Sequence, residues 1–292
     1  MVTPFTAEGT LDTSGLDRLV DALLAGGVEG IFVLGTTGEG VYVPPAIRLK
    51  LVERTVQRTA GRVKIFAGLG DIRNSDVSEA NAFLRAGADA VVAHPPIAEK
   101  IPLDRLQGWF KSLLDKLNGP LLIYNMPPTT GVSIPLDAVE KLLGHPRLAG
   151  IKDSENNPQR LGELLKRFGG KKDFAVFVGV GALMEMGLKL GADGIVPSVG
   201  NLIPDICQQL CEAAQKSDWN QAEQLYARMN SVAAVYQKGR TLNESLAALK
   251  AAVHCRGLCA PDVLPPLHSL PAIEVEKIRT QMEQLHLLNE TP

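Results

Sequence analysis

Short apolar runs alternate with longer mixed stretches along most of this chain of 292 residues, and this alternation limits how it can fold. Eight runs are strand candidates, at residues 1–5, 30–35, 64–69, 90–94, 121–125, 149–153, 174–179 and 194–198. Strands that alternate with helices form parallel sheets joined by crossover connections. The pattern therefore predicts an α/β fold, a (β/α)8 TIM barrel, which commonly forms a single domain near this length.

The last quarter of the chain follows a different pattern. From Ser217 onward glycine becomes rare and no strand candidate appears, whereas apolar residues recur at helical spacing. Two stripes result: Trp219, Ala222, Leu225, Met229, Val232 and Tyr236, then Val275, Ile278, Met282 and Leu285. We predict a barrel over residues 1–216 and a C-terminal helical extension over residues 217–292 that packs on the barrel or on a neighbouring subunit.

Lys152 ends an apolar run short enough to be a buried strand. Burial penalises the charged form of a lysine, so a buried amine can be neutral near pH 7 and attack a ketone to form a Schiff base. The alternative is an ion pair with Asp153 or a neighbouring carboxylate, and this segment alone favours it, because structural ion pairs also occur at strand ends.

Residues 35–40 form a glycine-rich loop, Gly-Thr-Thr-Gly-Glu-Gly, after an apolar run and before Pro44 and Pro45, a candidate helix start. Glycines allow backbone N–H groups to approach a ligand closely, and Thr36 and Thr37 add hydroxyl donors, which suits a carboxylate. The glycine spacing matches neither of the common nucleotide-binding motifs. An ordinary tight turn is the alternative.

Tyr124 lies at the end of the apolar run 121–125, which is followed by Pro127 and Pro128. Prolines cannot continue a hydrogen-bonded ladder, so the strand is expected to end here with the tyrosine near its tip. Near an ammonium or iminium a phenol can transfer protons. The alternative is a tyrosine that caps the core, with its hydroxyl satisfied by the backbone.

The unusual residues all fall at the carboxyl ends of the strand candidates. Thr36 and Thr37 follow the second strand, Tyr124 ends the fifth, Lys152 the sixth, Gly179 the seventh and Ser198 the eighth. In a (β/α)8 barrel this rim holds the active site. The pattern therefore predicts a candidate site rather than scattered structural residues.

Four segments occur in a particular order: Gly35-Thr36-Thr37-Gly38-Glu39, Tyr124-Asn125-Met126-Pro127, Gly150-Ile151-Lys152-Asp153 and Gly191-Ala192-Asp193-Gly194. In this order and spacing they resemble the dihydrodipicolinate synthase and N-acetylneuraminate lyase superfamily, and the resemblance covers nearly the whole chain. It implies a pyruvate-dependent class I aldolase on a (β/α)8 barrel with a helical extension. It also implies a homotetramer or homodimer that uses neither a metal nor a separate cofactor. The start of the chain does not suggest secretion, so we expect the protein in the cytoplasm.

The resemblance also implies roles for individual residues. Lys152 would be the Schiff-base lysine, Tyr124 the proton shuttle, and Thr36 and Thr37 the binders of the pyruvoyl carboxylate. Val196 would pack beside the lysine. Three more residues would face the distal part of the substrate: Gly179 through its carbonyl, Ser154 and Ser198. The family normally has several residues before the start of this chain, so the first strand is expected to be shortened or to begin differently.

Some positions depart from the synthase pattern. Members that make dihydrodipicolinate usually carry an arginine where this chain has Thr129, and a proton-relay tyrosine after the fourth strand, where this chain has His94. Sialic acid lyases and keto-deoxy-sugar acid aldolases usually place an acidic residue just after the seventh strand, where this chain has Val180 and Gly181, and its absence counts against a highly hydroxylated substrate held in the usual way. The segment Pro128-Thr129-Thr130-Gly131 nevertheless looks closer to the aldolases than to the synthase. We expect the chain to lie closer to the 2-keto-3-deoxy acid aldolases than to the synthase.

Composition excludes several other classes of protein. The net charge of -2 and a pI near 6.2 offer no basic surface for nucleic acid. No apolar stretch reaches the ~18 residues of a membrane span, and no basic-then-apolar leader is present. Four cysteines, Cys207, Cys211, Cys255 and Cys259, are expected to be small apolar residues, although a four-thiolate zinc site is conceivable. His94 either lines the site or packs in the core.

We therefore predict a lyase that cleaves a 2-keto-3-deoxy acid reversibly to pyruvate and an aldehyde through an imine at Lys152. Two alternatives stay open. One is 4-hydroxy-tetrahydrodipicolinate synthase, which joins pyruvate to aspartate semialdehyde, or a related dehydratase. The other is a non-catalytic protein that binds a 2-oxo acid.

Overall fold

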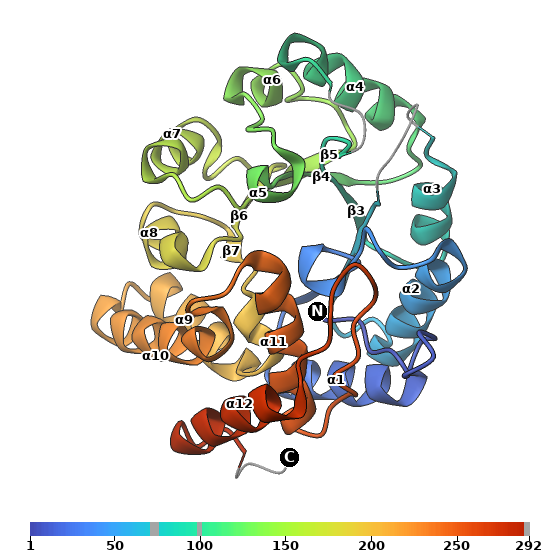
Figure 1. Cartoon of the computed structure of the whole chain (residues 1–292). Helices are drawn as coiled ribbons and strands as arrows, with labels where there is room; N and C mark the ends of the chain where they lie inside the picture. Colours follow the sequence, from blue (N-terminus) through green and yellow to red (C-terminus); the bar gives the residue numbers. More distant parts are fainter. Residues whose placement is uncertain (71–75, 98–100, 289–292) are drawn as a thin grey trace. The chain divides into compact units, whose positions relative to one another are not determined.

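The computed structural model describes residues 1–70, 76–97 and 101–288, and the chain divides into two compact units (Figure 1). The first unit combines Met1–Lys64 with Ser198–Pro292, and the second comprises Ile65–Pro197. The boundary that we predicted at residue 216, between barrel and helical extension, does not coincide with the boundaries of these two units. The division into barrel and extension stays a prediction.

A parallel sheet forms the centre of the second unit. Its strands are β2 (Lys64–Gly68), β3 (Ala90–Ala93), β4 (Leu121–Asn125), β5 (Leu148–Asp153), β6 (Ala175–Val178) and β7 (Gly194–Ile195). Each strand pairs in parallel with the next one along the chain. Neighbours in sequence are thus neighbours in the sheet, and the carboxyl ends of the strands meet at one edge.

Helices connect these strands and lie on the outer side of the sheet in Figure 1. They are α3 (Ser78–Arg85), α4 (Leu106–Lys116), α6 (Leu136–Glu140), α7 (Pro158–Phe168) and α8 (Met184–Lys189). The connections also contain three short helical turns: α5 (Pro127–Thr130), η2 (Leu103–Arg105) and η3 (Gly181–Leu183). In α7, the Asn157 side chain caps the first turn, and Pro158 occupies a position where no N–H is needed. Its buried residues, Leu161, Leu164, Leu165 and Phe168, recur at helical spacing and form one apolar face.

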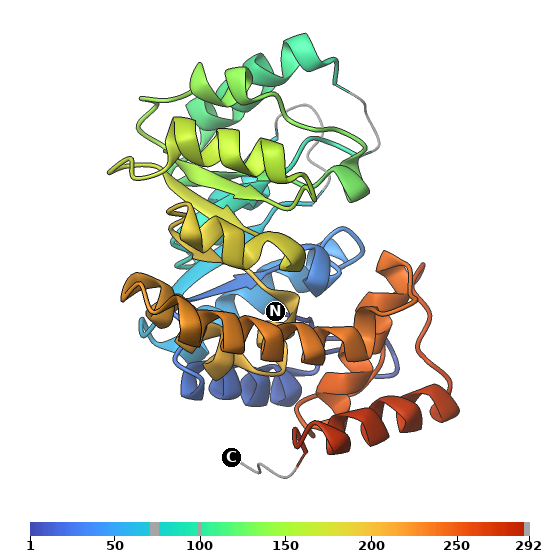
Figure 2. The same cartoon turned by 90° about the vertical axis from the view of Figure 1, so that its left-hand side faces the viewer.

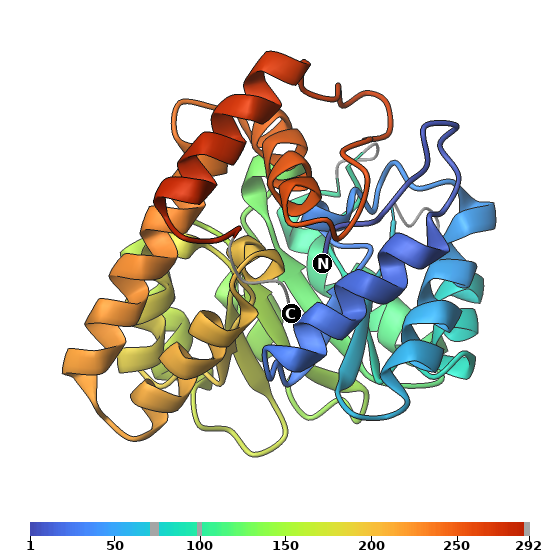
Figure 3. The same ribbon diagram turned by 90° about the horizontal axis from the view of Figure 1, so that it is seen from below.

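The first unit is mainly helical. It contains α1 (Thr13–Ala25), β1 (Gly30–Val33), η1 (Thr36–Gly38), α2 (Pro45–Thr59), η4 (Ser198–Asn201), α9 (Pro204–Gln215), α10 (Trp219–Gln237), α11 (Leu242–Cys255) and α12 (Ala272–Gln284). Helix α10 packs along α9 (Figure 2), and α12 lies against α10 and α11 (Figure 3). The predicted helical stripes after Ser217 are confirmed, and α2 begins at Pro45 as expected.

Residues 1–5 are not a strand, so the first of the eight predicted strands is wrong. Phe5 makes only an isolated antiparallel bridge with Leu11. The polar groups of this segment bond elsewhere: the amino group of Met1 donates to the Phe32 carbonyl, and the Val2 N–H donates to the Asn201 side chain. Pro4 has no N–H to offer. The apolar side chains of residues 2–5 are buried, but the backbone of this segment does not form the repeated hydrogen bonds of a β-sheet.

Membrane insertion of a helix requires both length and apolar character. Within residues 1–70, 76–97 and 101–288, no helix is both long enough and apolar enough to cross a lipid bilayer.

Candidate active site

Tyr124 and Lys152 face each other across neighbouring strands of the second unit. They are partners in the register between β4 and β5, so their side chains emerge on the same face of the sheet. Both are buried, with exposed fractions of 4% for Tyr124 and 8% for Lys152. The Lys152 Nζ lies 4.2 Å from the centroid of the Tyr124 ring. The amine and the aromatic ring therefore lie next to each other at the carboxyl ends of β4 and β5, largely shielded from solvent.

Backbone hydrogen bonds continue the pairing beyond the regular strands. The Ser154 N–H donates to the Asn125 carbonyl over 2.9 Å, and the Gly179 N–H donates to the Asp153 carbonyl over 2.7 Å. The Val196 N–H reaches the Val178 carbonyl over 2.9 Å. These bonds bring Ser154, Gly179 and Val196 to the same edge of the sheet as Lys152.

Gly179 leaves room for the lysine side chain. A Cβ at this position would lie 2.6 Å from Lys152 Cε and would overlap the Ser154 hydroxyl. Any larger residue would therefore displace one or both groups. The Ser154 Oγ is buried and has no hydrogen-bond partner among the residues that the structure describes. A buried hydroxyl without a partner is unfavourable, so this oxygen is available to a bound molecule.

His94 follows β3 and packs against the tyrosine. Its ring centroid lies 6.4 Å from that of Tyr124, with the rings inclined at 66°, an edge-to-face contact. The His94 Nδ1 is 2.7 Å from the Pro95 carbonyl oxygen. Because a carbonyl can only accept, Nδ1 donates this bond. His94 thus both lines the Tyr124 side of the site and packs in a buried position.

A polar network lies on the opposite face of the same strand ends. Adjacent residues of a strand point to opposite faces, so Asn125 and Asp153 turn away from Tyr124 and Lys152. Asn125 donates to the Asp153 carboxylate over 2.9 Å, and the Arg160 Nε donates to the same carboxylate over 2.9 Å. Asp153 is thus engaged by Arg160. Burial raises the pKa of Asp153, although Arg160 acts to lower it.

We did not predict this network from the sequence. The signal was present: an asparagine directly follows the tyrosine, and an aspartate directly follows the lysine. Because side chains alternate between the two faces of a strand, residues next to Tyr124 and Lys152 lie on the opposite face of the sheet. There the bond from Asn125 to Asp153 holds the two strand ends together.

The threonine loop lies in the first unit and is tightly packed. Thr36 and Thr37 open the turn η1, and both are half-buried. A Cβ at Gly40 would overlap the Leu34 carbonyl, and a Cβ at Gly38 would lie 2.8 Å from the Met1 carbonyl oxygen. The glycines are therefore required for close backbone contact.

Ser198 begins η4, also in the first unit. Its Oγ lies 2.7 Å from the phenol oxygen of Tyr236 on α10. Burial raises the pKa of Tyr236. The Ser198 hydroxyl thus already has a protein partner.

The structure therefore joins Lys152, Tyr124, Ser154, Gly179 and Val196 at one edge of the second unit. Thr36, Thr37 and Ser198 belong to the other unit, and their part in a common site stays a prediction. Thr129 follows the same strand as Tyr124, and its Oγ1 is buried with no hydrogen-bond partner in the described chain.

Two of the four cysteines, Cys207 and Cys259, are buried. Burial raises the pKa of both Cys207 and Cys259 to about 12, so both are protonated near neutral pH. Among the described residues no group of three histidine, cysteine or acidic side chains is arranged to hold a metal ion.

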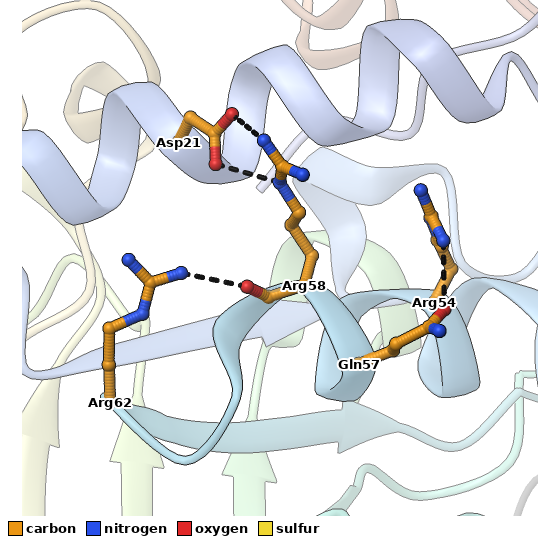
Figure 4. A pocket seen from close by; sticks show the side chains of 5 residues that line it. All are labelled: Asp21, Arg54, Gln57, Arg58 and Arg62. Carbon is orange, nitrogen blue, oxygen red and sulfur yellow. Dashed lines mark hydrogen bonds and ion pairs between the residues drawn. The ribbon is translucent and has the colours of Figure 1, made fainter.

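A separate hollow on the first unit is lined by charged residues (Figure 4). It measures about 420 Å³ and is bordered by Asp21, Arg54, Gln57, Arg58 and Arg62. The Arg58 Nε donates to Asp21 over 2.8 Å, and Arg62 donates to the Arg58 carbonyl over 2.8 Å. This hollow lacks a nucleophile and is not a candidate active site.

Comparison with known proteins is consistent with this geometry. The model of the dihydrodipicolinate synthetase family matches residues 1–285. The 4-hydroxy-tetrahydrodipicolinate synthase of Polynucleobacter asymbioticus is 29% identical, over 99% of this chain and 94% of its own. Synthase 1 of Streptomyces coelicolor is 32% identical, over 92% of this chain and 87% of its own.

Solved structures agree with these relatives. Dihydrodipicolinate synthase from Bacteroides thetaiotaomicron superposes with a TM-score of 0.89 at 30% identity, over 97% of this chain and 96% of the other. YagE from E. coli K12, a prophage protein of the dihydrodipicolinic acid synthase family solved in complex with pyruvate, superposes with a TM-score of 0.90 at 27% identity, over 98% and 96%. The expected fold class is confirmed: an α/β TIM barrel with C-terminal helices.

Proposed function

The chain belongs to the dihydrodipicolinate synthetase family of pyruvate-dependent class I lyases, and on that premise we propose that Lys152 forms a Schiff base with the ketone of a 2-oxo acid. One observation carries the proposal: the buried Lys152 places its Nζ 4.2 Å over the ring of Tyr124. The amine attacks the ketone carbon, and the ketone oxygen leaves as water. The protonated imine then withdraws electrons from the neighbouring carbon–carbon bond.

Tyr124 is the proposed proton carrier. In the cleavage direction, it takes the proton from the C4 hydroxyl as the C3–C4 bond breaks and the aldehyde leaves. The remaining enamine accepts a proton at its terminal carbon and is hydrolysed to pyruvate. In the condensation direction, the enamine attacks an aldehyde, and Tyr124 returns a proton to the new alkoxide. Its position opposite Lys152 in the strand register supports this role.

The other site residues hold the substrate in the proposed reaction. Thr36 and Thr37 bind the carboxylate, so that the ketone meets the amine at attack distance. Val196 packs beside Lys152, and the Gly179 carbonyl, Ser154 and Ser198 face the distal part. The unpartnered Ser154 hydroxyl supports this assignment most directly, because it borders the same space at Gly179 as the lysine side chain.

Condensation of pyruvate with aspartate semialdehyde is the candidate that the comparisons favour. The named relatives at 29% and 32% identity are 4-hydroxy-tetrahydrodipicolinate synthases. These names do not support our expectation that the chain lies nearer the 2-keto-3-deoxy acid aldolases.

Cleavage of a 2-keto-3-deoxy acid is the second candidate, and one observation favours it. Thr129 stands where the resemblance leads us to expect an arginine for the carboxylate of aspartate semialdehyde, and its buried hydroxyl has no hydrogen-bond partner among the described residues. A hydroxyl supplies one donor and no charge, so it holds a carboxylate less strongly than the charged, bidentate guanidinium would.

Borohydride trapping tests the shared imine step. Incubation with pyruvate and borohydride should add a reduced pyruvoyl group to the Lys152 peptide, and Lys152→Met should abolish the labelling. Folded protein whose Lys152 peptide stays unlabelled would refute the proposal.

Parallel assays then identify the partner. Consumption of aspartate semialdehyde with pyruvate supports the synthase, whereas pyruvate release from 2-keto-3-deoxy acids supports cleavage. Trapping without turnover across the panel would indicate a protein that binds 2-oxo acids without catalysis.

A further inference from the structure

A buried ion pair anchors the threonine loop from the C-terminal helices. Glu39 follows Thr36–Gly38 directly and adopts a left-handed backbone, with φ of 57°. One of its carboxylate oxygens accepts a hydrogen bond from the Lys250 Nζ, and the other accepts from the Leu264 N–H over 2.8 Å. The exposed fractions are 2% for Glu39 and 1% for Lys250. The pair thus joins residues 211 positions apart in sequence.

Lys250 itself is held by several groups. Its Nζ also donates to the Asp262 carbonyl over 2.8 Å and lies 4.6 Å from the centroid of the Phe5 ring. Burial lowers the pKa of Lys250, whereas the Glu39 carboxylate acts to raise it. Buried ion pairs add little net stability, because desolvation offsets most of their attraction. Their more consistent effect is to specify one geometry.

Glu39 is hydrogen-bonded directly to the turn that carries the two threonines. The Glu39 N–H donates to the Thr36 carbonyl over 3.1 Å and so closes the turn that carries Thr36 and Thr37. Two neighbouring contacts hold the same loop: the Thr3 hydroxyl donates to the Gly38 carbonyl over 2.6 Å, and Arg48 donates to the Gly40 carbonyl. The Lys250 contact differs from these because it bonds to a side chain of the loop rather than to its backbone, and because it comes from helix α11.

We propose that Lys250 is a positioning residue for 2-oxo acid binding, which it supports by fixing Glu39 and, through it, the Thr36–Thr37 turn. The inference rests on the proposed function, in which this turn binds the substrate carboxylate. Through Lys250 on α11, the C-terminal helices would then contribute to substrate binding in addition to packing against other helices. Without Lys250 the Glu39 side chain loses one of its two anchors and the turn is held less firmly; a shift of about 1 Å at a binding group is enough to weaken binding by roughly ten- to a hundredfold.

Two variants separate this role from stability. Lys250→Met leaves the Glu39 charge unpaired, whereas the double variant Lys250→Met with Glu39→Gln removes both charges and is therefore the one expected to fold. The matched control is Lys277→Met, which removes an exposed lysine that pairs with Glu274 over 2.7 Å on α12. Circular dichroism and thermal unfolding establish the folded fraction of each.

The first readout is the pyruvate concentration that gives half-maximal borohydride trapping. We expect it to rise at least about tenfold in the folded double variant and to stay unchanged in Lys277→Met. A merely structural role would change the folded fraction without changing the half-saturating concentration. A folded double variant with the wild-type value would overturn the proposal.

The second readout is hydrogen exchange of the amides at residues 36–40 without pyruvate. Exchange should be faster in the double variant than in wild-type protein or in Lys277→Met, and equal rates would contradict the anchoring role. Because this measurement needs no imine, it separates the two ideas: wild-type protein that is not trapped refutes the function of Lys152, while loop exchange still tests Lys250.

Discussion

At the scale of single residues, the candidate site depends on how closely side chains pack around one lysine. Lys152 and Ser154 both border the position that a Cβ would take at Gly179. Tyr124 lies under the amine, and His94 meets the tyrosine edge to face. These groups lie at or just beyond the carboxyl ends of neighbouring strands, and each contact depends on the size of the residues around it.

The space at Gly179 yields a direct prediction. In Gly179→Ala the new methyl group meets Lys152 Cε and the Ser154 hydroxyl, both at the flexible ends of side chains, so these move and the fold stays intact. We expect borohydride trapping with pyruvate to slow by about a hundredfold, since a misplaced nucleophile loses its attack geometry.

Gly181→Ala is the control for this substitution. A Cβ at Gly181 would meet nothing within 4 Å, so this variant should trap pyruvate at the wild-type rate. Equal trapping rates for the two variants would show that the space at Gly179 does not position the lysine.

At the scale of secondary structure, capping residues decide where helices begin. Helix α11 starts with a capping box in which Thr241 and Glu244 satisfy each other's backbone groups. Helix α1 starts at the Asp12 side chain, which accepts from the Gly15 N–H over 2.9 Å. Both caps are short sequence patterns, so their positions follow from local chemistry.

The Asp12 cap predicts a pH-dependent stability. Burial alone would raise the pKa of Asp12, but hydrogen bonds from Gly15 and Ser14, with the charge of Arg18, lower it below the ordinary value of 3.8. A lowered folded pKa means that the stabilisation is complete above the ordinary value and is lost as the pH falls through the folded one. At neutral pH, Asp12→Ala should reduce the free energy of unfolding by about 1 kcal/mol.

Urea unfolding at a series of pH values checks this expectation. The difference between wild type and Asp12→Ala should shrink as the pH is lowered below 3.8 towards the lower pKa of the folded state. Asp12→Asn is the matched variant, because asparagine also caps helices but does not titrate in this range. A difference between wild type and Asp12→Ala that is constant with pH would contradict the role of the charged cap.

At the scale of the whole molecule, membership of the family is established, and the chain has the fold of its relatives over nearly its full length. The C-terminal helices form one compact unit with Met1–Lys64, and the ion pair between Glu39 and Lys250 lies inside that unit. The assembly into a homotetramer or homodimer stays a prediction.

Pyruvate should stabilise the folded chain as a whole. A ligand at about 100 times its dissociation constant adds roughly 2.7 kcal/mol to the folded state. For a chain of 292 residues we expect the midpoint of thermal unfolding to rise by about 4–5 °C. Differential scanning calorimetry with and without pyruvate measures this shift. Lys152→Met should lose most of it, and a wild-type protein with no shift would argue against pyruvate as the ligand.

The sequence by itself determined the strand order, the helices after Ser217 and the likeness to the family, because alternation, helical periodicity and glycine-rich turns are local patterns. It also placed Lys152 and Tyr124 at strand ends, as the structure confirms. The sequence-based prediction failed at residues 1–5, where an apolar run suggested a strand. In the structure this segment makes only an isolated bridge, and the Val2 N–H bonds to the Asn201 side chain instead of to a neighbouring strand.

Only the tertiary structure decided which side chains meet. The register of β4 with β5 put Tyr124 opposite Lys152, and chain folding brought Lys250 to Glu39 across 211 residues of sequence. The physical reason is that burial and pairing depend on neighbours distant in the chain, whereas periodicity reports only on residues a few positions apart.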